Sequence, residues 1–267
     1  MNTRRTAAFF DLDKTIIATS SAAAFSRPFL AQGLMNRRSV LRSAYAHFLY
    51  MIAGADEDQT ERMRAYLSDL VAGWDVAQVS AIVGETLNQF IDPYVYSEAV
   101  ELIAEHHAAG RDVVIVSASG AELVEPIAAA IGADHAIATR MEIADGRYTG
   151  KIDFYCYGDN KALAIRQLAQ NQGYDLERSY AYSDSSTDLP MLEEVGFAYA
   201  VNPDRTLRRV AESRGWGVLN FVRPVSLWHQ LPVSRGTATA LTASAASAIL
   251  ALVAWRIVRR IRRRGGR

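Results

Sequence analysis

The pattern of apolar and polar residues changes twice along the 267-residue chain. Residues 7–10 form a short apolar run that is typical of a buried strand, and an acidic loop begins directly after it at Asp11. From about Ser20 to Phe90 the apolar residues recur at helical spacing instead. Glycines interrupt this stretch at Gly33, Gly54 and Gly73. We therefore expect a strand followed by several short helices.

The rest of the chain alternates between helical and strand patterns. Helical patterns cover residues 97–109, 121–131 and a stretch from Asn160, strand patterns cover 113–116, 136–139 and 180–182, and a hairpin is expected near Gly146. Nearly continuous apolar strands that are separated by helices are typical of a parallel sheet buried on both faces. The sequence therefore predicts an α/β fold: a Rossmann-like parallel sheet with helices on both faces and an inserted helical cap domain.

These changes of pattern divide the chain into three parts. We expect an α/β catalytic core at residues 1–17 and 93–222, with a helical cap at residues 18–92 inserted between them. Residues 223–267 follow as a linker, an apolar Ala-rich segment at 236–255 and an Arg-rich tail. A cap in this position is expected to close over the site and to determine substrate specificity.

The Ala-rich segment is a candidate for membrane contact. Residues 237–255 carry no charge, and as a helix they would be roughly 30 Å long, about the thickness of a bilayer core. Eight of these nineteen residues are Ala and only five are Leu, Ile or Val, so the free energy of insertion is marginal. A helix in the membrane interface, a hairpin-like insertion, a transmembrane tail anchor that violates the positive-inside rule and an unattached Ala-rich tail are all open. We expect a cytoplasmic catalytic body that associates with the membrane through the C-terminal segment.

Charge is distributed unevenly along the chain. It has 29 basic and 29 acidic residues, but seven arginines and no acid lie between Arg256 and Arg267, so residues 1–255 carry a net charge of −7. A basic tail on an acidic body favours an anionic membrane surface as a partner. No nucleic acid is expected, because the chain has no nucleic-acid-binding motif. The single cysteine, Cys156, excludes an internal disulfide, and no secretory signal is visible.

The acidic loop carries the first candidate catalytic residues. Asp11 and Asp13 lie two residues apart after the first strand, where ligands of open α/β sheets bind. If Asp11 attacks phosphorus, the second acid can protonate the leaving alkoxide and then activate the water that cleaves the acyl phosphate. Mg²⁺ suits this pair because it is a hard cation that binds carboxylate and phosphate oxygens together. Taken alone, such a pair is equally typical of a turn or helix cap.

Three further polar elements occupy similar positions. Ser117 ends a β-branched run, where its hydroxyl could hold a phosphate oxygen or cap the next helix. Lys161 opens a predicted helix, where its ammonium could offset the charge of a phosphoryl group. Asp184 and Asp188 follow the last predicted strand, with Asp184 placed to complete a metal site and Asp188 to orient Lys161 or a metal-bound water.

Together and in this order, these elements resemble the motifs of the haloacid dehalogenase superfamily of phosphohydrolases. The family motif Asp-x-Asp-x-Thr is matched by Asp11, Asp13 and Thr15, the second motif by Ser117, the third by Lys161 and the fourth by Asp184 and Asp188. The likeness covers about residues 6–220. The helical insertion and the sequence Leu189-Pro190-Met191 are similar to the phosphoserine-phosphatase-like branch of that family.

The resemblance implies a role for each matched residue. It implies that Asp11 is the nucleophile, Asp13 the acid/base, Ser117 and Lys161 the phosphate-binding residues, Asp11, Asp13 and Asp184 the Mg²⁺ ligands, and Thr15 and Asp188 supporting residues. The implied activity is Mg²⁺-dependent hydrolysis of a small phosphorylated metabolite or lipid-derived phosphate through an aspartyl-phosphate. A dehalogenase is disfavoured, because halide leaves without a proton whereas an alkoxide needs an acid at position 13.

Alternatives remain for the function and for several residues. A phosphotransferase acting on an alcohol, or a membrane-associated regulator on the same fold, would fit the same motifs. Free phosphoserine is disfavoured, because Thr19–Ala23 lacks the glutamate with which related enzymes bind the substrate's amino group. Arg27 could meet a second anionic group or lie at the surface. His106 and His107 face different directions on a predicted helix, and we interpret both as surface residues.

Overall fold

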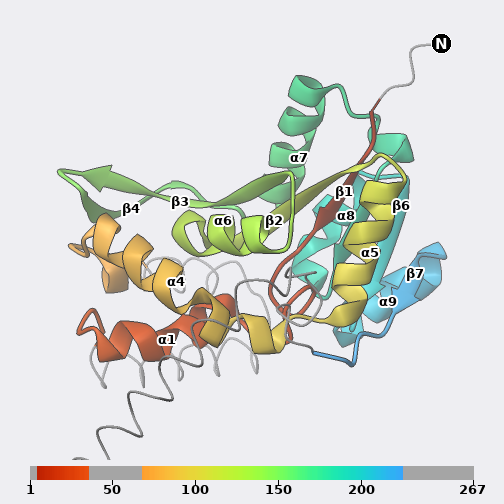
Figure 1. Ribbon diagram of the computed structural model, residues 1–267. Coiled ribbons are helices and arrows are strands. Elements are labelled where there is room, and N and C mark those ends of the chain that lie inside the picture. Colours follow the sequence, from red (N-terminus) through yellow and green to blue (C-terminus); the bar gives the residue numbers. More distant parts are fainter. Residues whose placement is uncertain (1–4, 36–67, 225–267) are drawn as a thin grey trace, which may run out of the picture. The chain divides into compact units, whose positions relative to one another are not determined.

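Seven strands form one sheet in a computed structural model, which describes residues 5–35 and 68–224 (Figure 1). Their order across the sheet is β4-β3-β2-β1-β5-β6-β7. They are β1 (Ala7–Phe10), β2 (Asp112–Gly120), β3 (His135–Ala144), β4 (Arg147–Phe154), β5 (Tyr180–Ser183), β6 (Phe197–Val201) and β7 (Gly217–Leu219). All neighbours are parallel except β3 and β4, which are antiparallel. The predicted α/β fold is confirmed, with an antiparallel hairpin at one edge.

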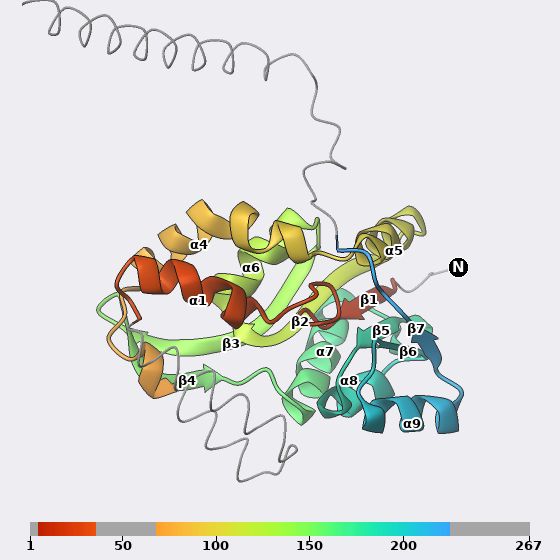
Figure 2. The same cartoon turned by 90° about the horizontal axis from the view of Figure 1, so that it is seen from below.

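The helices cover both faces of the sheet, as the sequence predicts. The described helices are α1 (Ser21–Ala31), α4 (Val76–Phe90), α5 (Ser97–Ala108), α6 (Ala121–Ala130), α7 (Asp159–Gln172), α8 (Leu189–Glu193) and α9 (Arg205–Arg214), with 3-10 turns η1 (Asp92–Tyr94), η2 (Leu176–Arg178) and η3 (Ser186–Asp188). Helices α5 and α6 lie on one face of the sheet and α7, α8 and α9 on the other (Figures 1 and 2). One apolar cluster joins the sheet to α5 and α6, and a second joins it to α7, α8 and α9.

Strand β1 lies between these two layers, which explains its sequence. Ala8 and Phe10 belong to the cluster on the α5 and α6 side, whereas Ala7 and Phe9 belong to the opposite cluster. Because successive side chains of a strand point to opposite faces, a strand between two helical layers is apolar at every position. All four residues are completely buried. The short apolar run before Asp11 is therefore a central strand of the sheet.

Helices α1 and α4 fall within the predicted insertion, and we call them the inserted helices. They pack against each other and against α6. The start of α4 also bonds to the β3–β4 hairpin: the Val76 N–H donates to the Gly146 carbonyl at 3.0 Å, and the Tyr148 N–H donates to the Trp74 carbonyl at 3.1 Å. The division into core and cap at residues 17/18 and 92/93 stays a prediction, and the expected helix break at Gly54 lies outside the described residues.

The hairpin expected near Gly146 is confirmed. Asp145 and Gly146 link β3 to β4, and both have positive φ, at 51° and 74°. Two consecutive residues with positive φ are typical of the type I′ turn, whose twist matches that of the two strands it joins. The sequence Asp-Gly therefore determines this connection locally.

The segment after Asp188 contains elements that the sequence pattern did not predict. Strands β6 and β7 extend the parallel sheet beyond β5, with α9 between them. Two local signals mark α9: the Asp204 side chain accepts a hydrogen bond from the Leu207 N–H at 2.7 Å, and Gly215 ends the helix at φ 68°. An aspartate at the start and a left-handed glycine at the end are common helix caps.

The described helices include none that is both long and apolar enough to cross a membrane. The Ala-rich segment at 236–255 and the Arg-rich tail lie outside the described residues, so membrane association through them stays a prediction.

The interpretation of His106 as a surface residue is wrong. Its side chain is buried, while His107 is exposed. The Arg111 Nε donates to His106 Nδ1 at 2.7 Å, so the other ring nitrogen, Nε2, carries the proton of the neutral ring and donates to the Tyr182 hydroxyl at 2.9 Å. Burial, together with the charges of Arg111 and His107, lowers the pKa of His106 to about 4. The His106 ring is therefore uncharged and belongs to the buried core on the α5 side of the sheet.

This neutral histidine predicts a pH dependence of stability. An unfolded histidine has a pKa of about 6.5, so the folded pKa is depressed. Its contribution to stability is complete above pH 6.5 and is lost as the pH falls towards 4. We expect the free energy of unfolding to fall by about 2 kcal/mol more in the wild type than in His106→Gln between pH 7.5 and 4.5. Urea denaturation measures this, and His107→Gln should behave like the wild type.

Candidate active site

The candidate residues come from the carboxyl ends of adjacent strands. β1 lies between β2 and β5. Asp11 and Asp184 directly follow β1 and β5, and Ser117 lies within the last four residues of β2. The Asp11 N–H donates to the carbonyl of Tyr182 in β5 at 2.9 Å, which fixes the start of the acidic loop against the neighbouring strand. Because parallel strands end at the same edge of a sheet, residues more than a hundred positions apart meet there.

Lys161 joins two of the predicted acids. Its ammonium lies 2.6 Å from Asp11 Oδ1 and 2.8 Å from Asp188 Oδ2, and all three side chains are buried. The Ser183 hydroxyl also donates to Asp188 Oδ2, at 2.7 Å. These contacts link β1, the first turn of α7 and the η3 turn before α8. Asp188 is therefore in a position to orient Lys161, and its supporting role stays a prediction.

The electrostatics of this cluster favour a charged lysine. Burial alone would lower the pKa of Lys161, but the Asp11 and Asp188 carboxylates outweigh that effect and raise the pKa above its usual range. Burial raises the pKa of Asp11, and the positive charge of Lys161 opposes this rise. A direct contact with an ammonium favours the ionised carboxylate. We therefore treat Asp11 and Lys161 as a buried ion pair.

Asp13 has entirely different partners. The Ser21 N–H donates to its Oδ1 at 2.9 Å, and the Ser119 hydroxyl donates to its Oδ2 at 3.1 Å. The hydroxyls of Ser21 and Ser119 also lie 2.8 Å apart. Burial raises the pKa of Asp13, and these hydrogen bonds only partly offset the rise. Asp13 is thus a carboxyl group with an elevated pKa, held in one orientation by two serines.

Sequence reasoning missed Ser21 and Ser119. Ser119 stands two residues after Ser117 in β2, and this spacing places both side chains on the same face of a strand. That spacing is a signal that could have identified it. Ser21 is the first residue of α1, and nothing in its local sequence indicates a contact with Asp13. Only the packing of α1 against the acidic loop brings them together.

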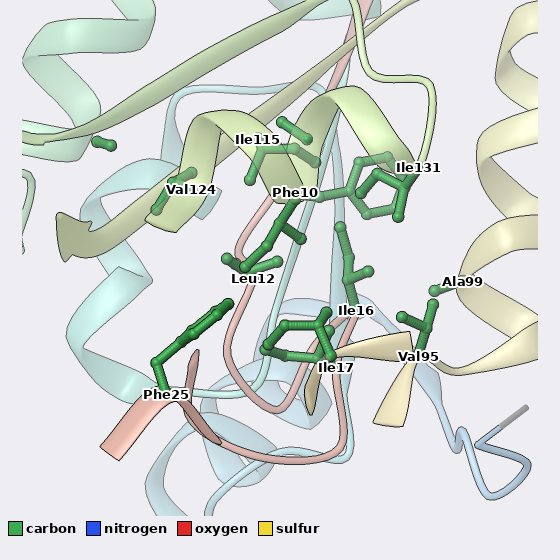
Figure 3. Packing of buried hydrophobic residues seen from close by; sticks show 14 of the residues in the cluster. Phe10, Leu12, Ile16, Ile17, Phe25, Val95, Ala99, Ile115, Val124 and Ile131 are labelled. Carbon is green, nitrogen blue, oxygen red and sulfur yellow. The ribbon is translucent and has the colours of Figure 1, made fainter. Parts of the chain in front are cut away.

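Leu12 separates the two acids by anchoring the loop between them. Its side chain is completely buried in the apolar cluster that also contains Phe10 and Ile16 (Figure 3). Its carbonyl accepts hydrogen bonds from the N–H groups of Ile16 and Ile17 at 2.9 and 3.1 Å. These contacts fix the position of the loop between the two acids, whose side chains have different surroundings.

Ser117 and Thr15 are buried at the same edge. The Ser117 hydroxyl accepts a hydrogen bond from the Ser119 N–H at 3.2 Å. Thr15 Oγ1 has no hydrogen-bond partner, the only such buried side-chain atom in the part of the chain that the structure describes. Buried polar groups usually have a partner, so this hydroxyl is available to a group that enters the site. The phosphate-binding role of Ser117 and the supporting role of Thr15 stay predictions.

Asp184 is the remaining candidate metal ligand. It is half-buried, and burial raises its pKa to about 7, although the charge of Lys14 opposes the rise. The negative charge of Asp184 in turn helps to raise the pKa of Asp11. A cation between Asp11 and Asp184 would relieve this repulsion. The described residues contain no three acidic, histidine or cysteine side chains that converge on one point, so Asp11, Asp13 and Asp184 do not form a complete metal cage.

Comparison with known proteins agrees with this geometry. A family model described as haloacid dehalogenase-like hydrolase matches residues 8–193, from β1 to the end of α8. The chain is a haloacid dehalogenase-like hydrolase. The match includes every residue that the sequence motifs identified, from Asp11 to Asp188.

Relatives of this hydrolase cover nearly its whole length. A probable phosphatase of Mycobacterium tuberculosis is 61% identical over 247 residues, which are 92% of this chain and 86% of the relative. The inhibition of morphological differentiation protein of Streptomyces azureus is 58% identical over 261 residues, 96% and 94% of the two chains. A crystal structure of a Bordetella pertussis protein of unknown function is similar with a TM-score of 0.72 and 31% identity, covering 81% of this chain and 99% of that one.

The buried ion pair predicts a specific loss of stability. Lys161→Met would leave Asp11 and Asp188 buried without a counter-charge, which costs about 3–5 kcal/mol of unfolding free energy at pH 7. The deficit should shrink as the pH falls, because protonation of Asp11 removes a buried charge that has lost its counter-charge.

Urea denaturation in EDTA at pH 7 and pH 5 measures this deficit. Lys161→Met/Asp188→Asn should recover part of the stability, since one of the two buried charges is gone. Lys151→Met, at an exposed lysine paired with Glu142, is the control and should unfold like the wild type. If Lys161→Met were as stable as the wild type, Lys161 and its two aspartate partners would not be charged in the folded protein.

Proposed function

We propose that this hydrolase is a Mg²⁺-dependent phosphomonoester phosphatase that forms an aspartyl-phosphate on Asp11. The observation that carries the proposal is the difference between its two loop acids: Asp11 contacts the Lys161 ammonium, whereas Asp13 contacts only hydroxyl and amide donors. A nucleophile must be ionised, and an acid that protonates a leaving group must keep its proton. The different surroundings of the two aspartates therefore support Asp11 as the nucleophile and Asp13 as the acid.

The proposed first step forms one bond to phosphorus and breaks another. Lys161 holds Oδ1 of Asp11, which leaves Oδ2 to attack the phosphorus atom. As the Asp11 oxygen–phosphorus bond forms, the bond from phosphorus to the alcohol oxygen breaks, and the proton of Asp13 passes to that oxygen. The products are the free alcohol and an aspartyl-phosphate.

The second step restores the site. A water molecule gives its proton to Asp13 as its oxygen bonds to phosphorus, and the Asp11 oxygen–phosphorus bond breaks to release inorganic phosphate. Ser21 and Ser119 hold Asp13 in place for both proton transfers. The positive charge of Lys161 offsets the negative charge of the phosphoryl group throughout. Ser117 is proposed to bind a phosphoryl oxygen.

Mg²⁺ fits the residues at this edge of the sheet. Asp11 and Asp184 are the two carboxylates that would hold it, and their mutual repulsion favours a cation there. Mg²⁺ commonly binds through one or two carboxylates together with water and substrate phosphate, so a complete protein cage is not required. Bound Mg²⁺ would neutralise charge on the transferring phosphoryl group. Asp13, whose carboxylate oxygens are held by Ser21 and Ser119, is better suited to proton transfer than to metal binding.

Asp11→Asn tests the nucleophile. The wild type should hydrolyse p-nitrophenyl phosphate and several alkyl phosphates with Mg²⁺ and lose activity in EDTA. Asp11→Asn should lose at least about a thousandfold in kcat, because an amide is a poor nucleophile. Release of inorganic phosphate measures the activity of the wild type and of the variant. Added alcohols would reveal transfer of the phosphoryl group to an acceptor other than water. A regulatory function would be favoured instead if the wild type showed no phosphatase activity and Asp11→Asn still fulfilled the cellular role of the protein. The name of the Streptomyces relative points to such a function.

Ser119→Ala tests the acid/base assignment of Asp13. Loss of one hydrogen bond should lower kcat about tenfold for alkyl phosphates, whose leaving groups need a proton. Hydrolysis of p-nitrophenyl phosphate should change less, because p-nitrophenolate leaves readily without protonation. Ser26→Ala is the control, since that hydroxyl donates only to a carbonyl within α1. An equal loss on both substrates would contradict the assignment.

A further inference from the structure

Strand β2 is irregular at the candidate active site. Its pairing with β3 is regular up to Ser117, but the next paired residue of β2 is Gly120, opposite Thr139. Ala118 and Ser119 lie between the paired residues and form a bulge in β2. A β-bulge disrupts the hydrogen bonds of the ladder and changes the direction of the side chains beside it. The direction of the Ser119 side chain therefore depends on the bulge and not on regular strand geometry alone.

The bulge directs Ser119 towards the proposed acid/base residue. The Ser119 hydroxyl donates to Asp13 Oδ2 at 3.1 Å, and the Ser119 N–H donates to the Ser117 hydroxyl at 3.2 Å. A serine hydroxyl lies only one bond beyond Cβ, so its position follows that of the backbone that carries it. The contact with Asp13 is therefore kept only while the bulge keeps its shape.

The side chain of Thr139 fixes the shape of this bulge. Its hydroxyl donates to the Ala118 carbonyl at 2.7 Å and accepts a hydrogen bond from the Cys156 N–H at 3.1 Å. Thr139 and Cys156 are both buried. Because the bulge takes the Ala118 carbonyl out of the regular ladder, that carbonyl needs another donor. The Thr139 hydroxyl supplies the donor and so stabilises the bulged conformation.

Cys156 connects the same hydroxyl to the segment that leads to Lys161. This segment runs from the end of β4 to α7, whose first turn carries Lys161. The Cys156 thiol donates to the Ile137 carbonyl of β3 at 3.7 Å, which gives the segment a second contact with β3. Removal of the Thr139 hydroxyl should therefore disturb the bulge more than it disturbs Lys161.

We propose that Thr139 is a positioning residue of the active site: its hydroxyl holds the β2 bulge in the shape that lets Ser119 orient Asp13. This inference rests on the proposed phosphatase function and deepens it by adding a residue behind the acid/base. Thr139 takes no part in the bond changes at phosphorus. Its effect on the reaction passes through Ser119, so it concerns proton transfer to the leaving group.

Thr139→Val tests this role. Valine has nearly the shape of threonine but lacks the hydroxyl, so the variant loses both hydrogen bonds. Its kcat for n-propyl phosphate should fall about tenfold, because the alkoxide needs the proton of Asp13. Its kcat for p-nitrophenyl phosphate should stay within about threefold of the wild type, because p-nitrophenolate leaves without that proton. The ratio of the two kcat values does not depend on how much of the variant is folded.

Two further variants serve as rescue and control. Thr139→Ser keeps the hydroxyl and should restore the ratio to within about twofold of the wild type. Thr149→Val is the matched control, because the Thr149 hydroxyl also donates to one group, Glu142 Oε2, and accepts from one N–H, that of Lys151, but at an exposed position. Its ratio should equal that of the wild type. An equal fall of the ratio in Thr139→Ser and Thr139→Val would contradict a role of the hydroxyl.

A double variant shows whether Thr139 acts through Ser119. Ser119→Ala/Thr139→Val should have the same ratio as Ser119→Ala alone, because the hydroxyl that Thr139 positions is already gone. If the losses of the two single variants multiply in the double variant, Thr139 does not act through Ser119 and the inference is overturned.

The outcomes separate this inference from the catalytic proposal. If the wild type hydrolyses both substrates and Thr139→Val changes neither kcat or lowers both equally, the positioning role is disproved while the phosphatase stands. If the wild type hydrolyses neither substrate, the proposed function fails, and the positioning role fails with it.

Discussion

The buried contact of Lys161 with Asp11 and Asp188 is the interaction on which the candidate site depends. An ammonium without water is stable only when carboxylates surround it, so the chain must bring β1, α7 and the η3 turn to one point. The sheet order provides this, because β1 lies at the centre with β2 and β5 on either side. Both faces of β1 are covered by helices, which keeps the ion pair away from solvent.

Leu12 gives two neighbouring aspartates different chemistry. By filling the apolar core between them, it directs Asp11 to a lysine and Asp13 to two serines. Such a difference in surroundings is what the proposed roles of nucleophile and proton donor require of the same residue type. The difference depends on the fold of the loop and not on the spacing of the acids alone.

The inserted helices contribute directly to this site. Ser21 begins α1 and donates its N–H to Asp13, so this carboxyl group is held partly from outside the sheet. The β3–β4 hairpin, which carries Gly146 and Tyr148, forms backbone hydrogen bonds to the residues at the start of α4. The contacts of Asp13 therefore come partly from the inserted helices, whereas those of Asp11 come from the sheet and from α7.

The sequence alone determined the central strand, the Asp-Gly hairpin and the order of the polar motifs, because each depends on local spacing or on residues after an apolar run. It did not reveal β6 and β7, whose short runs lack a clear period, nor the burial of His106. Ser21 was equally hidden, since a serine at a helix start is locally ordinary. Ser21 and Ser119 reach Asp13 from a helix and from a distant strand, and only the packed tertiary structure brings the three residues together.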